Sequence, residues 1–194
     1  MRNEDFLVTK VLIAANVIAF VVEIVLLGPS VLSGATNPSD MLKVGAMTGN
    51  QIFAKQYLPL FTSMFIHMSL IHIISNMMSL WILGRAVEPA IGNIKFLLFY
   101  VIAGLAGNLL SVKMANPNIV SAGASGAIFG IMGLEVGGLI FNKLASTGGS
   151  RSVAIQSIGE VIVLNLINSV LNPSINLWAH LGGLIAGFIL AIFI

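Results

Sequence analysis

The run from Ser121 to Gly130 contains the residue with the clearest potential for chemistry, a serine between small residues. It reads Ser-Ala-Gly-Ala-Ser-Gly-Ala-Ile-Phe-Gly, so Ser125 stands where an apolar stretch begins. We expect a helix to start here, with unpaired N–H groups and the positive end of the helix dipole beside the serine. Gly123 and Gly126 would let a foreign backbone approach closely. Ser125 is therefore a candidate nucleophile in a setting that favours a developing oxyanion.

Two of the three histidines belong to a second polar group within an apolar stretch. His72 and Asn76 are four residues apart and share one face of a helix, at about 100° per residue. Both side chains can donate hydrogen bonds, as an oxyanion hole requires. His67 is turned by roughly 140° from His72 on the same helix, so we expect it to tie down a loop instead.

The third histidine, His180, opens the last apolar stretch of the chain. It is expected on the same side of the membrane as Ser125, so that the two residues share one depth. Glycines recur along both stretches and would let the two helices touch. They are Gly126, Gly130, Gly133 and Gly137 on one stretch and Gly183 and Gly187 on the other, while Gly138 is expected off the packed face. We predict a dyad in which His180 is the general base for Ser125.

Each motif also has a plainer explanation when it is taken alone. Ser125 would cap a helix, and the glycines would merely pack, as small residues do in membrane helices. A single membrane histidine such as His180 would only bond a neighbouring helix. The convergence of the serine with His72, Asn76 and His180 favours catalysis over these explanations.

The composition indicates that lipid is the solvent of these elements. Of the 194 residues, 57% are hydrophobic and 8% are charged, against roughly a quarter charged in soluble domains. Long apolar runs in a bilayer must form helices or a closed barrel, and these runs lack the alternation of barrel strands. The net charge of +2 includes no basic stripe, so nucleic acid is not an expected partner. With no cysteine, thiolate chemistry is excluded.

The fold class expected is an all-α polytopic membrane protein with six transmembrane helices in a single domain, residues 1–194. A run of about 20 apolar residues crosses a bilayer. The predicted spans are Val8–Leu27, Leu60–Leu83, Phe96–Val112, Ala122–Phe141, Val153–Leu171 and Ile175–Ile194. The second and fifth spans are the expected gate for a substrate that enters from the membrane.

The connections predict the orientation of these spans. Lysine and arginine gather on the side of both termini, which predicts cytoplasmic termini and a site that opens to the outer face of the cell membrane. Six of them are expected there (Arg2, Lys10, Arg85, Lys95, Lys143 and Arg151) and three on the other side (Lys43, Lys55 and Lys113). The long connection Gly28–Pro59 is expected to form short interfacial elements. A signal peptide is the alternative for the first run, but the run is longer than the usual apolar core of such peptides.

The three motifs together resemble the rhomboid family of intramembrane serine proteases. That family carries Gly-x-Ser-Gly, His-x4-His-x3-Asn and Ala-His-x2-Gly-x3-Gly, in this order. Here the first is centred on Ser125, the second begins at His67, and the third begins at Ala179. Gly84–Glu88 and Gly92 resemble the family's turn between the second and third spans.

The resemblance implies roles for particular residues. Ser125 would be the nucleophile, His180 the general base and then acid, and His72 and Asn76 the oxyanion hole with the Ser125 backbone N–H. Gly123 and Phe129 are expected to contribute to substrate binding. The substrate would be a transmembrane helix of another membrane protein, and the lipid bilayer is the other partner. No metal or other cofactor is implied.

Two residues depart from the family pattern. Active relatives usually end the first loop in Trp-Arg, where this chain has Tyr57 and Leu58, which puts the docking of that loop in doubt. Phe129 stands where many relatives have tyrosine. It follows Ser125 by four residues, so its ring can still stack on His180.

Other functions are weaker interpretations of the same residues. Glu23, Glu135 and Glu160 would suit a channel or transporter, but they form no spaced series along one span, and the two halves of the chain do not repeat. A zinc protease lacks its His-Glu-x-x-His motif. A rhomboid-like protein that binds membrane helices without catalysis remains the main alternative. The sequence does not predict the oligomeric state.

Overall fold

The computed structural model describes residues 6–146, 150–172 and 174–194. Within these ranges the chain is a helical bundle whose only strand-like pairing is one antiparallel bridge between Met47 and Ser121. Four helices are long and apolar enough to cross a membrane, and two further apolar helices are shorter. The long ones are α1 (Leu7–Leu27), α6 (Leu70–Ile91), α7 (Asn93–Met114) and α9 (Arg151–Leu171), and the shorter ones are α8 (Ser125–Ile140) and α10 (Leu177–Leu190), which η2 (Ala191–Phe193) continues.

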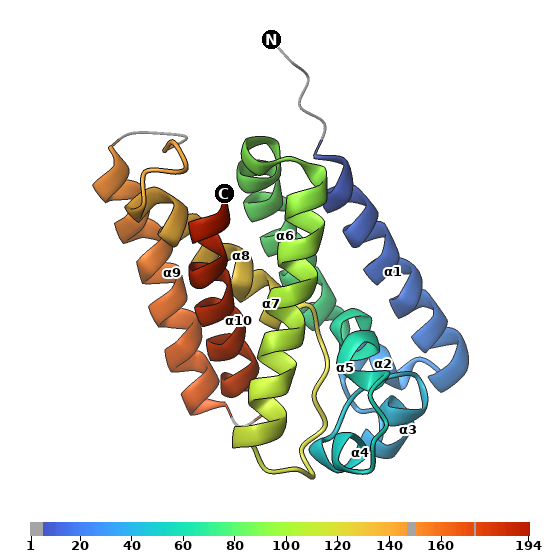
Figure 1. Ribbon diagram of the computed structural model, residues 1–194. Coiled ribbons are helices and arrows are strands. Elements are labelled where there is room, and N and C mark those ends of the chain that lie inside the picture. The colour runs from blue at the N-terminus through green and yellow to red at the C-terminus, as the bar shows by residue number, and fades with distance from the viewer. Residues whose placement is uncertain (1–5, 147–149, 173) are drawn as a thin grey trace.

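The start of α1 and the end of α10 lie at the same end of this bundle, as Figure 1 shows. The Lys95 ammonium group, at the start of α7, donates to the backbone carbonyl of Phe193 there. The opposite end carries the short helices of the first connection, α2 (Ser30–Ser33), α3 (Pro38–Lys43), α4 (Gly49–Phe53) and α5 (Pro59–Thr62). The prediction of short elements in this connection is confirmed. Arg2, one of the six basic residues expected on the side of the termini, lies outside the described residues.

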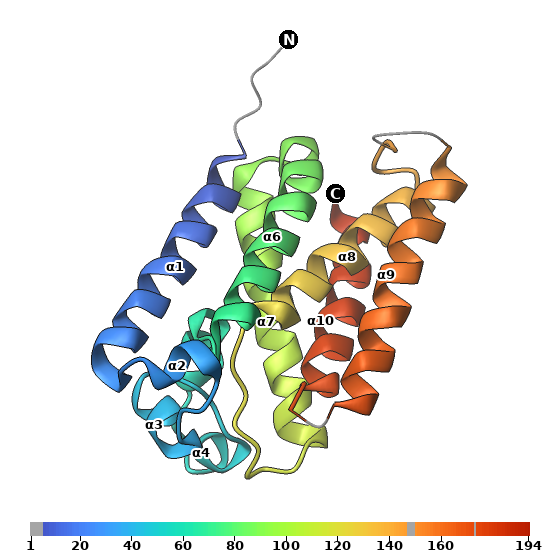
Figure 2. The same ribbon diagram turned by 180° about the vertical axis from the view of Figure 1, so that it is seen from behind.

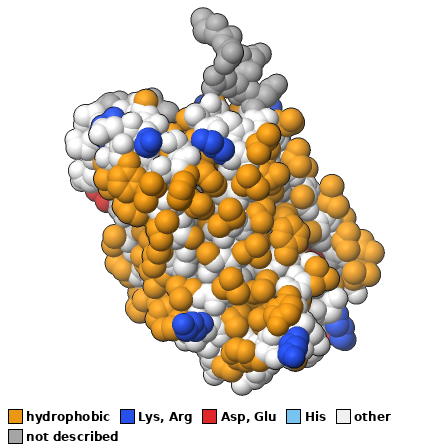
Figure 3. All heavy atoms as spheres, in the orientation of Figure 1, with side chains coloured by type: hydrophobic (Ala, Val, Ile, Leu, Met, Phe, Trp, Pro, Cys, Tyr) orange, Lys and Arg blue, Asp and Glu red, His pale blue; other side chains and the backbone are white. Residues whose placement is uncertain are grey.

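The outer surface of the bundle matches a lipid environment. Hydrophobic side chains cover its flank in Figure 3, and lysine and arginine side chains lie toward the two ends. Apolar residues on the long helices are widely exposed, among them Val25, Ile71, Ile94 and Leu164. In water this exposure would carry a large free-energy cost, whereas lipid tails solvate such side chains. The prediction of membrane-spanning apolar helices agrees with this surface.

Helix α8 lies at the centre of the bundle and packs against α7 and α10. Glycine makes the close approach possible, because a Cβ at Gly183 or Gly187 would overlap the backbone carbonyl of Gly126 or Gly130. A Cβ at Gly182 would lie 2.9 Å from the Cα of Gly107 on α7. The predicted contact between the two glycine faces is therefore present in the structure. Gly138, expected off that face, is instead buried against Leu144 and Ile194.

The second predicted span, Leu60–Leu83, is wrong at both ends. The chain forms α5 and the 3-10 turn η1 (Ser63–Phe65), leaves the helical conformation, and starts α6 at Leu70. Ser69 caps α6 by accepting a hydrogen bond from the His72 N–H. His67 therefore lies in a non-helical segment, so the 140° turn calculated for it on a helix does not apply. The other five spans agree with the helices to within a few residues.

The predicted turn at Gly84–Glu88 and Gly92 is correct only at Gly92, where φ is 85°, because α6 continues through Gly84–Glu88 to Ile91. Two contacts to α1 explain why the helix runs on. A Cβ at Gly84 would overlap the side chain of Thr9. The buried Glu88 carboxylate accepts hydrogen bonds from the N–H groups of Val8 and Thr9, at 2.8 and 2.7 Å, and so supplies acceptors for the first turn of α1.

Candidate active site

The segment that leads into α8 is held on both sides before it reaches Ser125. Ser121 exchanges two backbone hydrogen bonds with Met47, and the Gly123 N–H donates to the Ser63 carbonyl at 2.8 Å. Gly123 has φ at 120°, a conformation that residues with a side chain rarely adopt. Helix α8 then begins at Ser125, after Ala124, and no side chain caps it. Ser125 is thus not a helix cap.

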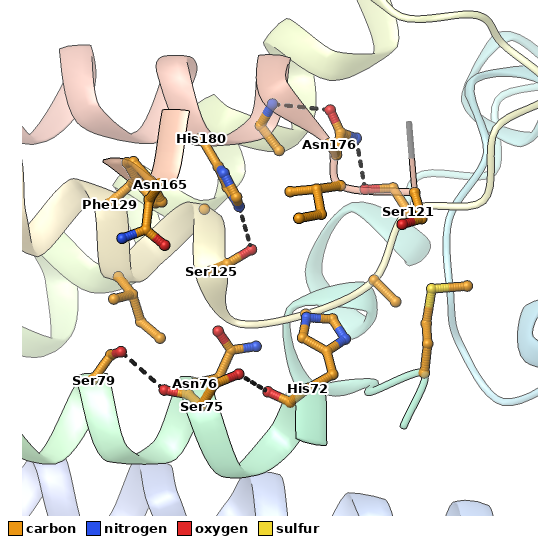
Figure 4. A pocket seen from close by; sticks show the side chains of 18 of the residues that line it. His72, Ser75, Asn76, Ser79, Ser121, Ser125, Phe129, Asn165, Asn176 and His180 are labelled. Atoms are coloured by element: carbon orange, nitrogen blue, oxygen red, sulfur yellow. Dashed lines mark hydrogen bonds between the residues drawn. The ribbon is translucent and has the colours of Figure 1, made fainter. Parts of the chain in front are cut away.

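The Ser125 hydroxyl instead faces a histidine on another helix. His180 lies in the first turn of α10, and its Nε2 is 2.9 Å from Ser125 Oγ. Asn176 caps α10 by accepting from the Ala179 N–H, and its amide also donates to Ser111 and Ser121. The start of α10 is therefore tied to α7 and to the segment before α8. Figure 4 shows His180 pointing at Ser125.

Phe129 supports the histidine ring from one side. The two rings are stacked, with centroids 4.2 Å apart and planes inclined by 11°. Phe129 lies one helical turn after Ser125, so α8 supplies both the hydroxyl and the surface on which the imidazole rests. The predicted stacking is present, and Phe129 also lines the cavity.

The second ring nitrogen of His180 has a partner that the sequence analysis missed. Ser169 on α9 places its hydroxyl 2.9 Å from His180 Nδ1. Within the described chain, both hydrogen bonds of the imidazole ring are to serines, one at each nitrogen. A catalytic triad has a carboxylate at this position, whereas a single serine on a neighbouring helix forms no motif that the sequence could reveal.

His72 and Asn76 lie on α6, across the cavity from Ser125 and His180 (Figure 4). An ideal Cβ at Gly123 would lie 2.8 Å from His72 Nε2 and 3.4 Å from Asn76 Nδ2, so both donors border the approach to Ser125. Asn76 Nδ2 is buried and has no hydrogen-bond partner among the residues that the structure describes. A buried donor of this kind is expensive unless something accepts from it. It is available to a negatively charged oxygen.

His67 holds the loop in front of α6. Its backbone N–H donates to the buried Glu23 carboxylate of α1, and its ring packs edge-on against His72 with centroids 5.1 Å apart. The expectation that His67 ties down a loop agrees with these contacts.

A cavity of about 560 Å³ joins these groups. All six predicted site residues line it, and its walls include polar residues of α6 and α9, the two spans expected to form the gate. The six are His72, Asn76, Gly123, Ser125, Phe129 and His180; the polar wall residues include Ser75, Ser79, Asn165 and Asn168. Among the described residues no three histidine or acidic side chains gather as metal ligands do. The arrangement suits nucleophilic catalysis with a positioned general base.

The fold is that of a helical protein with apolar helices long enough to cross a membrane, and the site groups a serine with a histidine and two hydrogen-bond donors. Comparison with known proteins gives the family: residues 54–194 match the rhomboid domain. The chain belongs to the rhomboid family.

Curated relatives agree with this assignment. The chain is 34% identical over 166 residues to RHOMBOID-like protein 1 of Arabidopsis thaliana, which covers 85% of this chain and 40% of that protein. It is 33% identical over 162 residues to rhomboid protease GluP of Bacillus subtilis, with 81% and 30% covered. It is 34% identical over 133 residues to the putative rhomboid protease YdcA of the same bacterium, with 68% and 64% covered. The chain thus spans well under half the length of the first two relatives.

Proposed function

We propose that this chain is an intramembrane serine endopeptidase that cleaves transmembrane helices of other membrane proteins with a Ser125–His180 dyad. The observation that carries the proposal is the 2.9 Å contact between Ser125 Oγ and His180 Nε2 at the edge of a cavity with oxyanion donors. Family membership and the similarity to proteins named rhomboid proteases support it.

The reaction would proceed as acyl transfer in two steps. His180 takes the Ser125 proton as the oxygen attacks the carbonyl carbon of the substrate. His72, Asn76 and the Ser125 backbone N–H stabilise the negative oxygen of the tetrahedral intermediate. His180 then gives the proton to the leaving amine, and water hydrolyses the acyl-enzyme with His180 again as base. The stacked Phe129 ring and the bond at Nδ1 keep the imidazole aimed at the serine.

A peptide bond in a helix is poorly exposed, so the substrate must unwind to present its carbonyl carbon. Its freed N–H and C=O groups then need partners, which lipid cannot supply. The serine and asparagine side chains of α6 and α9 that line the cavity are suitable partners. Entry between α6 and α9 would bring an unwound segment to Gly123, beside the side chains of His72 and Asn76.

We propose that α8 and α10 complete six membrane spans in one domain, residues 1–194. Helix α8 is only 16 residues long, roughly 24 Å at 1.5 Å per residue. It begins inside the bundle, as Figure 2 shows, so its first residue Ser125 would lie below the membrane surface. The lysine and arginine distribution supports cytoplasmic termini in a cell membrane and a cavity that opens outward.

Labelling with a fluorophosphonate probe tests this function. Such a probe reacts with an activated serine, so the purified protein should be labelled, and Ser125→Ala and His180→Ala should not be. Folding of each variant is checked by thermal denaturation in detergent. Equal labelling of Ser125→Ala would contradict the proposal. A folded wild-type protein that is inert to the probe, but binds a transmembrane helix, would point to the binding protein without catalysis.

A further inference from the structure

Helix α9 contributes one buried polar side chain to the centre of the bundle. Only Ile162 and Ser169 are buried along its 21 residues. Ser169 is 4% exposed and lies near the C-terminal end of the helix, shortly before the chain turns into α10. Its hydroxyl makes two contacts, one to the Asn165 carbonyl at 2.8 Å and one to His180 Nδ1 at 2.9 Å.

The hydrogen of this hydroxyl can serve only one of the two contacts. A carbonyl oxygen has no proton to give, so the contact to Asn165 exists as a hydrogen bond only if Ser169 donates. The Ser169 oxygen must then accept from the ring, which requires that His180 Nδ1 carries a proton. In a neutral imidazole the other nitrogen, Nε2, is then unprotonated and accepts from the Ser125 hydroxyl.

We propose that Ser169 is a positioning residue that holds His180 in the Nδ1-protonated tautomer, the one in which Nε2 can act as a base toward Ser125. The inference rests on the proposed protease function. Without the Ser169 acceptor, either ring nitrogen can carry the proton. In the opposite tautomer Nε2–H would point at Ser125 and could not remove its proton.

A neutral serine should contribute less to the rate than the carboxylate of a catalytic triad does. It orients the ring and selects the tautomer, but it brings no negative charge to stabilise the imidazolium that forms during attack. Loss of one hydrogen bond between neutral groups is typically worth about tenfold in an equilibrium or a rate. We therefore expect about a tenfold fall in kcat from its removal, with KM little changed, because Ser169 does not have to touch the substrate.

Substitutions at position 169 separate the hydroxyl from the shape of the side chain. Threonine and valine are alike in shape, and only threonine has the hydroxyl. Cleavage of a transmembrane reporter should fall about tenfold in kcat for Ser169→Ala and Ser169→Val and be retained in Ser169→Thr. Ser157→Ala, at an exposed position of the same helix, is the control and should match the wild type. Equal activity of the threonine and valine variants would overturn the proposal.

The tautomer itself can be observed by ¹⁵N NMR of histidine-labelled protein at alkaline pH, where the rings are neutral. Protonated and bare ring nitrogens give separate signals, and those of His180 are identified by their absence from His180→Ala. We expect protonated Nδ1 in the wild type and in Ser169→Thr, and a mixture in Ser169→Val. A wild-type His180 protonated at Nε2, or the same tautomer in all three proteins, would overturn the proposal. This readout needs no turnover, so it is separate from the probe test of the protease function.

Discussion

Helices α8 and α9 follow one another in the chain and both border the cavity, yet they are held very differently. Twelve of the 16 residues of α8 are buried, whereas two of the 21 residues of α9 are. Glycines bring α8 into backbone contact with α10, while a Cβ at Gly159 in α9 would have no described residue of another helix within 4 Å. Figure 2 shows α9 along the outer edge of the bundle.

This difference distinguishes a closely packed side of the site from a loosely packed side, where we expect a substrate helix to enter. Chemistry requires a pair held to within a fraction of an ångström, and Ser125 and His180 are on the closely packed helices. A substrate helix requires an opening, and a helix with few buried residues can shift at low cost. Ser169, near one end of α9, forms a hydrogen bond with His180 that links the two sides.

Loss of an oxyanion donor should have the largest effect among substitutions that leave Ser125 and His180 in place. Asn76→Ala removes the buried, unpartnered Nδ2 that borders Gly123. We expect kcat to fall by about 10²–10³-fold, with a smaller change in KM, because the donor is needed most when the oxygen is negative. Steady-state cleavage of a reporter measures both constants. An effect confined to KM would make Asn76 a substrate-positioning residue and leave the oxyanion role to His72.

Separating the packed helices α8 and α10 should have the next largest effect on activity. Gly183→Leu inserts a side chain where a Cβ already overlaps the Gly126 carbonyl, so the helices that carry Ser125 and His180 must part. A displacement of about 1 Å at a catalytic pair can cost on the order of 10²-fold in rate. Activity and melting temperature should therefore fall together.

Gly159→Leu is the matched control on the loosely held helix. In the described part of the chain no other helix lies within 4 Å of the added Cβ, so activity should stay within about twofold of the wild type. Gly138 on α8 would not serve as such a control, because it is buried. Similar losses in Gly159→Leu and Gly183→Leu would remove the distinction between the two helices.

Removal of the ring beneath His180 should have a smaller effect. Phe129→Leu keeps an apolar side chain but loses the stacked ring, a contact typically worth about 0.5–1.5 kcal/mol beyond burial, or roughly two- to tenfold in rate. Phe129→Tyr keeps the ring and should retain activity. Reporter cleavage by the two variants, compared at equal amounts of folded protein, checks this expectation. Equal losses would indicate that packing volume matters and stacking does not.

Much of the site could be predicted because its residues form local patterns. The spacing of His72 and Asn76 places both on one face of a helix, and the glycines of α8 and α10 predict close contact. The start of α6 was predicted wrongly because Ser69, its N-cap, lies within an apolar stretch that looks continuous in the sequence. Glu88 was predicted in a turn and lies in α6, because its hydrogen-bond partners on α1 are 79 and 80 residues away in the sequence. Ser169 was missed for a similar reason, since no pattern marks a single serine that meets a histidine on the next helix.

The most direct test of the account is cleavage of a transmembrane reporter helix by the purified protein in lipid vesicles. The wild type should cut the reporter within or near its membrane segment, and Ser125→Ala and His180→Ala should each leave it intact while melting near the wild-type temperature. Mass spectrometry of the products identifies the bond that is cut. Wild-type cleavage that persists in either folded variant would contradict the Ser125–His180 dyad, on which every other assignment in the site depends.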